Sequence, residues 1–520
     1  MRYRLALTLT QGGFVKYKYP ALPCRSYNKD YPRVEVRQNW RFGTAFGRRI
    51  LLKLQHVPLG RGKTFLAPAL LVLLFWGWTS VSAQTVQTDA SGPVLTRITE
   101  LLSASRYDEA VALFDTIPLP ERDSSHIRLL KASVLSSAGK YDEARAIAEA
   151  ISAAEPDNTE ALFVLAAIEG AQGKGKQQQA DLEKIIKIEP DNTAALVALG
   201  NLSLQNKALR PAASYFHSVL TKEPNNTDAL LGLARTFRLN KEWDDAEPLF
   251  NKVVELNPTM AEARSERALF YRARGRLQEA LSDLDAAKKL APNDYWVAID
   301  RGNILLDLNR KSDALAEYDR AISINPGEFL AYVYTSGLKD DLGDFDGAEK
   351  DYAVLAKLRP DYYYALEGLG LHKMKDGKWA EAKDAFMQAY TQAPKENEYA
   401  LLAAINWMRA EDISGPRAFL NQALGKVTRD TLEWYMFRLY YDLTTRNYAG
   451  ENDMVTRLDQ EKDQDLKARM LFYMAQYYDI RGNTALANKY YLLVNDMDKR
   501  NIPEWRLNDW IMIDRNLKSQ

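Results

Sequence analysis

The sequence predicts an all-α fold, a solenoid of stacked helix hairpins, and three kinds of residue in a fixed period predict it. Small residues lie 24 positions before each periodic proline, and alanine lies 12 positions before it in seven of eight periods. A residue that is apolar, and usually large, lies eight positions before it. Four registers held over eight periods indicate one repeated unit. The prolines, spaced by 34 residues, are Pro156, Pro190, Pro224, Pro258, Pro292, Pro326, Pro360 and Pro394.

Each period contains two apolar-periodic stretches of about a dozen residues, and each stretch is long enough for a helix. Glycine separates the two stretches, as in Gly139-Lys140 and Gly343-Asp344, which is typical of a helix C-terminus. The small residues of the two helices face each other and allow a close approach, and the large residue fills the gap to the next hairpin. Proline ends the second helix. The following Asp or Asn, as in Asp157-Asn158 and Asp191-Asn192, suits the N-cap of the next helix.

This pattern resembles the tetratricopeptide repeat, a 34-residue helix–turn–helix family. In-phase repeats cover 91–396, and looser ones, marked by Ala404, Tyr448 and Ala475, cover 397–501. We count about twelve repeats in an array that spans 84–501. The resemblance implies a right-handed superhelix with a concave groove lined by the first helices. Residues 502–520, with Trp505 and Trp510 among polar residues, are expected to form a capping helix over the last hydrophobic face. The in-phase repeats start at 91, 125, 159, 193, 227, 261, 295, 329 and 363.

Residues 61–83 resemble a secretory signal peptide. Arg61 and Lys63 precede the apolar run 65–78, and the small-x-small end of the segment predicts cleavage between Ala83 and Gln84. Residues 65–83 carry no charge, so an uncleaved membrane anchor and a buried helix remain alternatives. A cleaved signal predicts an exported protein, periplasmic or outer-membrane-associated. An uncleaved anchor predicts a protein held in the membrane by residues 65–83.

Residues 1–60 are basic, rich in aromatic and turn residues, and without a period. We expect them to be disordered, or not translated if the true start lies nearer the signal-like segment. An organelle transit segment is a further alternative, because the stretch is rich in Arg and poor in acidic residues. Residues 1–83 carry a net charge of +12, and the rest of the chain carries −12.

Composition excludes several classes of function. The acidic body lacks the basic clusters that nucleic acid requires, so we expect no nucleic-acid partner. Cys24 is the only cysteine, so the body holds no disulfide, no zinc site built from cysteines and no cysteine nucleophile. We expect membrane contact only through residues 65–83. The sequence leaves the oligomeric state open.

No catalytic constellation stands out. His126, His217 and His372 occupy different repeat positions and lack metal-ligand spacing, so we interpret them as exposed or half-buried helix residues. No nucleophile elbow or phosphate-binding loop occurs. Carboxylate pairs such as Asp244-Asp245 and Asp340-Asp341 are interpreted as caps or solvated charge. We therefore predict no enzyme, no cofactor and no metal.

The groove-facing positions that the resemblance implies form a patterned surface. It is expected to be basic in the repeats that start at 227 and 261, and acidic and aromatic from 295 to 364. Aromatic side chains beside Arg and Asp are typical of anchors for extended peptides. An ordinary solvated helix face is the alternative for each residue. The candidate binding residues are Asn201, Arg235, Arg238, Arg272, Trp296, Asp300, Asn303, Asp307, Tyr334 and Tyr364.

These residues favour a non-enzymatic scaffold that binds a protein or peptide outside the cytoplasm. A solenoid that binds carbohydrate or cell wall is an alternative, with Trp296, Tyr334 and Tyr364 as stacking platforms. A purely structural tether is a third. The pattern by which some family members clamp a C-terminal carboxylate is not met, because Val197, Leu231 and Ser265 occupy one of its positions.

Overall fold

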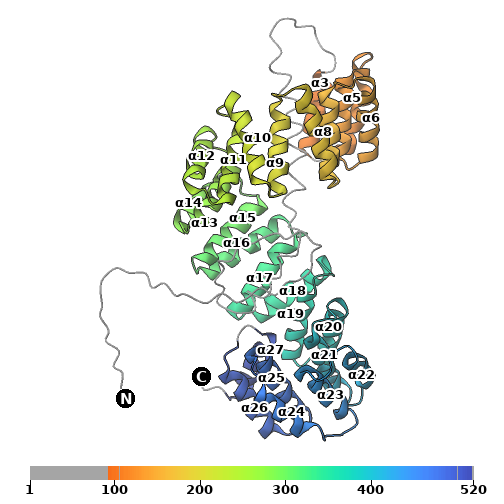
Figure 1. The fold of residues 1–520 in the computed structure, drawn as a ribbon, viewed down its shortest axis with the longest axis vertical. Coiled ribbons are helices and arrows are strands. Elements are labelled where there is room, and N and C mark those ends of the chain that lie inside the picture. The colour runs from red at the N-terminus through yellow and green to blue at the C-terminus, as the bar shows by residue number, and fades with distance from the viewer. Residues whose placement is uncertain (1–91, 105, 500–501, 518–520) are drawn as a thin grey trace, which may run out of the picture.

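A computed structural model describes residues 92–104, 106–499 and 502–517, and these residues form 25 α-helices and two short 3-10 helices. The predicted all-α repeat fold is confirmed, because the helices pack as consecutive helix–turn–helix pairs. Figure 1 shows the pairs stacked in chain order. The predicted segment 1–60, the segment 61–83 and the Ala83–Gln84 cleavage point lie outside the described residues.

The helices form twelve pairs followed by one final helix. The pairs are α3 (Gly92–Ser103) with α4 (Tyr107–Leu113), α5 (Ser125–Ser137) with α6 (Tyr141–Ala154), α7 (Thr159–Ala171) with α8 (Gly175–Ile188), α9 (Thr193–Gln205) with α10 (Leu209–Lys222), α11 (Thr227–Asn240) with α12 (Trp243–Leu256), α13 (Ala261–Ala273) with α14 (Leu277–Leu290), α15 (Tyr295–Asp307) with α16 (Lys311–Ile324), α17 (Phe329–Leu342) with α18 (Phe345–Leu358), α19 (Tyr363–Lys375) with α20 (Trp379–Gln392), α21 (Asn397–Ala410) with α22 (Arg417–Leu424), α23 (Leu432–Leu443) with α24 (Glu451–Gln460), and α25 (Gln464–Ile480) with α26 (Thr484–Asp496). The final helix is α27 (Pro503–Asp514).

The predicted helix starts are set by local chemistry. The side chains of Asn158, Asn192 and Asn226 each accept a hydrogen bond from a backbone N–H three residues on, as the sequence predicts for an N-cap. First helices therefore begin at the residues predicted from the proline period, from Ser125 to Tyr363.

The turns inside the pairs require a left-handed residue. Gly139 and Gly343 adopt it with φ of 77° and 83°, as expected for helix C-termini. Where the sequence lacks glycine, Lys241 and Asn309 adopt the same conformation with φ of 66° and 60°. The turn geometry is thus common to all these pairs, and the residue type adapts to it.

Large residues of the second helices fill the gap between hairpins, as predicted. The ring of Phe216 in α10 lies against Gly200 of its own pair and against Gly232 of the next pair. A Cβ atom added at Gly200 would lie 2.6 Å from the ring. The ring of Tyr318 lies against Gly302 in the same way, and a Cβ atom added at Gly302 would lie 2.5 Å from that ring. Small residues in the first helices therefore make room for the rings between them.

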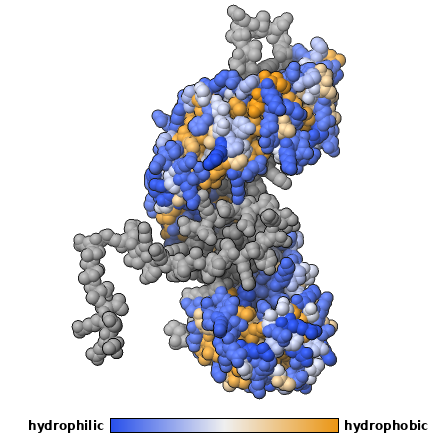
Figure 2. Space-filling model, in the orientation of Figure 1, coloured by the Kyte–Doolittle hydropathy of each residue, from blue (hydrophilic) through white to orange (hydrophobic). Residues whose placement is uncertain are grey.

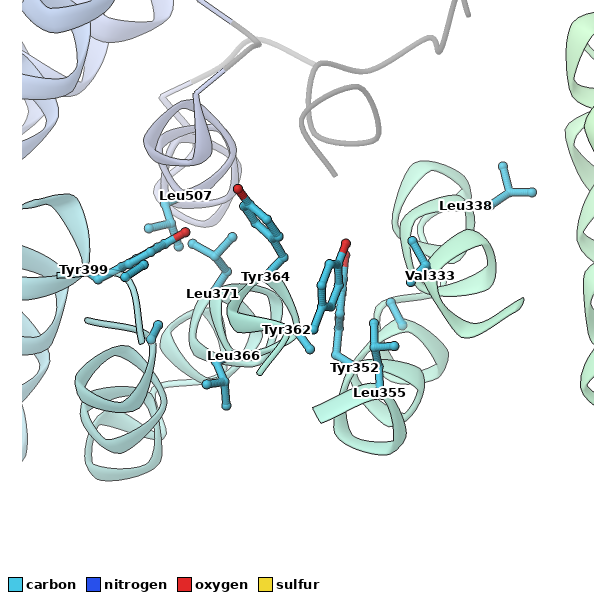
Figure 3. Close-up of a cluster of buried hydrophobic side chains, with 14 of the residues drawn as sticks. Val333, Leu338, Tyr352, Leu355, Tyr362, Tyr364, Leu366, Leu371, Tyr399 and Leu507 are labelled. Carbon is cyan, nitrogen blue, oxygen red and sulfur yellow. The ribbon is translucent and has the colours of Figure 1, made fainter. Parts of the chain in front are cut away.

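The apolar core becomes continuous toward the C-terminus. The first pairs contain separate smaller clusters, whereas one cluster of buried side chains extends from Leu230 in α11 to Met512 in α27. Figure 3 shows part of this cluster, where Leu507 of α27 lies near Leu371 of α19 and Tyr399 of α21. The tyrosines at 362, 364, 490 and 491 are all buried, so they contribute to packing within the stack.

The last pairs fold back on themselves. First helix α21 contacts α25 directly, and Arg409 of α21 forms an ion pair of 2.8 Å with Asp479 of α25. Helix α27 packs on α25 and α26, where the sequence expects a cap, and it also packs on α19. Figure 1 shows α27 beside α19 and α25. The C-terminal pairs therefore close into a more compact bundle than the N-terminal ones.

Candidate functional site

One side of the stack is built from the first helices. Several successive first helices contact one another directly, as α9 does with α11, α11 with α13, and α13 with α15. Within the described chain, successive second helices such as α6 and α8 pack less closely. The first helices therefore line the inner, more tightly curved side. We call their exposed side from α5 to α17 the inner face.

The arginines predicted in the inner face are paired with carboxylates of the next first helix. Arg235 of α11 lies 2.6 Å from Glu262 and 3.1 Å from Glu266, both in α13. Arg238 lies 3.5 Å from Glu266, and Arg272 lies 2.7 Å from Asp307. These pairs form a ladder of ionic contacts across three successive first helices.

The ladder corrects the expectation of a basic surface in the repeats that start at 227 and 261. The expectation counted the arginines but missed Glu262 and Glu266, which occupy positions 2 and 6 of the second of these repeats. Burial alone would lower the pKa of Arg235, but the two glutamates more than offset it and raise the pKa. Each arginine is thus held in a fixed position by a carboxylate of the next first helix. Positions 2 and 6 are groove-facing positions of the repeat, so the pattern that selected the arginines also indicates these two glutamates.

Three of the predicted binding residues are buried. Asp300 and Asn303 of α15 are 5% and 6% exposed, and the hydroxyl of Tyr318 donates a 2.8 Å hydrogen bond to Asn303. Tyr364 is 5% exposed and packs against the ring of Tyr363, with 4.2 Å between ring centroids. These three residues contribute to packing, and little of their surface reaches solvent.

The other aromatic candidates are half-buried. Tyr334 stacks on Tyr318 with 4.6 Å between ring centroids and 11° between planes. Trp296 packs edge-on against Tyr295 at 5.2 Å. Both rings are therefore held rigidly while part of each remains exposed on the inner face.

The N-terminal part of the inner face is more apolar. Phe163 of α7 and Val197, Ala198 and Leu204 of α9 are half-buried, and Asn201 among them is exposed. At the edge of this region, His126 Nδ1 lies 3.0 Å from Glu160, and this hydrogen bond raises the pKa of His126.

Elsewhere, the side of the molecule seen in Figure 2 has a largely hydrophilic surface with scattered apolar patches. Single exposed apolar residues such as Leu256 and Leu290 are ordinary features of protein surfaces.

Asp340 and His372 are more buried than the sequence predicts. The sequence predicts Asp340 as a cap or solvated charge and His372 as exposed or half-buried, but the Asp340 side chain is fully buried and His372 is 2% exposed. His372 Nε2 lies 2.8 Å from Asp340, and Arg506 of α27 lies 2.6 Å from it. Burial raises the pKa of Asp340, but His372, Arg506 and Tyr352 outweigh burial and hold it below its usual value. Arg506 lies 166 residues away, so no local pattern indicates this cluster.

The described residues contain no group of three or more His, Cys, Asp and Glu side chains arranged to hold a metal ion. None of the described helices combines the length and apolar composition that crossing a membrane requires.

Family models of one repeat family match four segments of the chain. Models described as tetratricopeptide repeat match residues 203–269, 129–176 and 338–397, and 298–328. These matches lie within the helix pairs of the array. No protein of curated function matches the sequence.

Solved structures that resemble parts of this chain share little of its sequence. A tetratricopeptide repeat protein from Parabacteroides merdae is 18% identical, with a TM-score of 0.40 over 48% of this chain and 99% of its own. Pseudomonas aeruginosa pilF is 20% identical, with a TM-score of 0.35 over 40% of this chain and 94% of its own. YrrB, described as a repeat protein with an unusual peptide-binding site, is 21% identical, with a TM-score of 0.28 over 35% of this chain and 95% of its own.

Proposed function

Because this chain is a tetratricopeptide repeat protein, we propose that it is a non-enzymatic scaffold that binds a protein or an extended peptide along its inner face. Tetratricopeptide repeat proteins are typically protein-interaction scaffolds and are generally non-catalytic. The ligand and the surface that it contacts are our proposal.

One observation carries the proposal: the charged side chains of the inner face are fixed before any partner arrives. Arg235 is held by Glu262 and Glu266, and Arg272 by Asp307. The half-exposed Trp296 and Tyr334 are held by neighbouring rings. A surface ordered in this way loses little conformational entropy when a partner binds. Rigid aromatic and arginine side chains are also the residue types that most often dominate binding energy.

The same geometry disfavours the carbohydrate alternative. Tyr364 is 5% exposed, and one face of Tyr334 is covered by Tyr318. A sugar that stacks on aromatic platforms would need more open ring faces than these two residues provide.

Site-specific photo-cross-linking tests the proposal. A photoreactive residue placed at exposed Asn201 of α9 is expected to capture a protein partner in the native cell, and the same residue at exposed Lys187 of second helix α8 is the matched control. Adding Trp296→Ala to the Asn201 probe is expected to weaken capture several-fold, because it removes an anchor at another point of the same surface. Equal capture at Asn201 and Lys187 would contradict an inner-face site. Capture of glycan alone would favour the carbohydrate alternative, and no capture would favour a tether.

We further propose that the body of the protein is exported, to the periplasm or in association with the outer membrane. The support is the signal-like sequence at 61–83, in particular the small-x-small end before Gln84. N-terminal sequencing of the protein purified from its native cell is expected to begin at Gln84. A first residue upstream of Phe65 would favour the anchor instead, with residues 65–83 retained in the membrane.

A further inference from the structure

Helix α27 makes two separate sets of contacts. One set joins it to the last pair: Glu504 accepts a 2.7 Å hydrogen bond from Tyr473 of α25, and Arg515, just after α27, forms a 2.7 Å ion pair with Asp479. The second set joins it to α17, α18 and α19, whose residues lie more than 120 positions earlier in the chain. The two sets use different side chains of the helix.

The second set is centred on the buried carboxylate of Asp340. His372 Nε2 lies 2.8 Å from one of its oxygens, and the Tyr352 hydroxyl donates a 2.9 Å hydrogen bond to the other. Arg506 of α27 then lies 2.6 Å from that second oxygen. Because two partners of Asp340 come from its own and the next repeat, the carboxylate is positioned without α27. Arg506 adds a third contact from outside these two repeats.

An aromatic contact lies one helical turn from this ion pair. Trp510 packs edge-on against Phe345 of α18, with 5.4 Å between ring centroids, and lies 5.5 Å from His372. Lys375 Nζ lies 4.9 Å from the centroid of the Phe345 ring. We call Asp340, Phe345, His372 and Lys375 the acceptor surface.

The residues that reach the acceptor surface suit recognition of a helix. Arg506 and Trp510 are four positions apart, so they project from one face of α27. Arginine and tryptophan are the residue types most enriched among dominant anchors of interfaces. Leu507, on the adjoining part of α27, is buried near Leu371 of α19, as Figure 3 shows. The contact thus combines a buried charge pair, an aromatic anchor and an apolar contact.

We propose that the acceptor surface is a helix-binding site and that α27 occupies it as an internal ligand. The ligand class is an amphipathic helix with an arginine and a tryptophan four residues apart. Attachment through the chain gives α27 a high effective concentration, so it excludes external helices of the same chemistry. Weakening the Arg506 contact frees the surface for such a helix, while Glu504 and Arg515 keep α27 on the last pair. The inference concerns only this chain and stands independently of any partner on the inner face.

A peptide added in trans tests the inference in the full-length protein. The probe is a fluorescent synthetic peptide of residues 502–517, and its binding is measured by anisotropy. The Arg506→Glu variant places a carboxylate opposite Asp340, so α27 is expected to leave the acceptor surface. We expect this variant to bind the peptide at least tenfold more tightly than the wild type does. Hydrogen exchange of residues 502–517 is expected to be faster in the variant.

Three controls make the result decisive. Arg506→Lys keeps the charge and is expected to leave peptide binding as weak as in the wild type. Adding Asp340→Ala to Arg506→Glu is expected to abolish binding, and so is Arg506→Glu in the peptide itself. A folded Arg506→Glu variant that binds no peptide would overturn the inference. If Arg506→Glu loses helical circular dichroism, Arg506→Ala takes its place, and loss of the fold in both would show that α27 is an integral element and not a ligand.

Discussion

Replacing Glu317 with alanine is expected to reduce the free energy of unfolding by about 3 kcal/mol, because it leaves three half-buried cations without their shared counter-ion. Glu317 of α16 is 5% exposed. Lys288 and Arg301 lie 2.8 and 2.7 Å from one of its oxygens, and Arg320 lies 2.9 Å from the other. These cations come from three successive helices, so the carboxylate joins two helix pairs. Urea denaturation measures the loss, and hydrogen exchange of α14–α16 shows where it falls.

The pH dependence of this contribution has a defined sign. Burial raises the pKa of Glu317, but Lys288, Arg320 and Arg301 outweigh burial and leave it below its usual value. A carboxyl whose pKa is lowered in the folded state stabilises the protein above its unfolded pKa, about 4.3. The contribution is lost as the pH falls through the lower folded value. The difference in stability between wild type and Glu317→Gln is therefore expected to be larger at pH 7 than at pH 3.

Asp313 of the same helix provides the matched control. It pairs with Arg310 at 2.6 Å, but both side chains are about half exposed. Exposed pairs contribute about 0–1 kcal/mol, so Asp313→Ala is expected to have a small effect. Equal losses for Asp313→Ala and Glu317→Ala would contradict the role assigned to the buried network.

Two glycines of the first helices are expected to respond differently to replacement by alanine. In each helix, alanine gains about 1 kcal/mol of helix propensity over glycine. At Gly302 the added Cβ would lie 2.5 Å from the ring of Tyr318, whereas at Gly337 of α17 nothing lies within 4 Å of it. Overpacking of this kind typically reduces stability by about 1–3 kcal/mol. Gly302→Ala is therefore expected to be neutral to destabilising, and Gly337→Ala stabilising.

Thermal and urea unfolding of both variants measure the difference. Because Tyr318 also binds Asn303 through its hydroxyl, a shifted ring in Gly302→Ala would disturb that 2.8 Å hydrogen bond as well. A stabilised Gly302→Ala variant would show that the first helix can move away from the ring, and that close approach is not what selects a small residue there.

The sequence predicts the helix pairs well because their signals are local and repeat. The N-caps at Asn158 and Asn192, the turn glycine at Gly139 and the ring of Phe216 each act within one or two repeats. A helix boundary that is ambiguous in one period can be placed from the other periods, since the same geometry recurs every 34 residues.

The candidate site is predicted less well, because its charges meet between repeats and its C-terminal part meets across the fold. Arg235 is correctly placed on a first helix, but its net effect depends on Glu262 and Glu266 in the next one. The burial of Asp340 depends on Arg506, which a repeat pattern does not connect to it. Periodicity specifies which face a residue occupies, and pairing across long sequence separations requires the folded structure.

The contact between Arg506 and Asp340 gives the two ends of the molecule different folding behaviour. Early pairs such as α5 and α7 meet after short loops close, so they can form locally and quickly. Docking α27 on α19 closes a loop of more than a hundred residues, and the entropy of that closure is lost before the contact gains anything. The C-terminal bundle is therefore expected to be completed late, after residues 503–514 have left the ribosome.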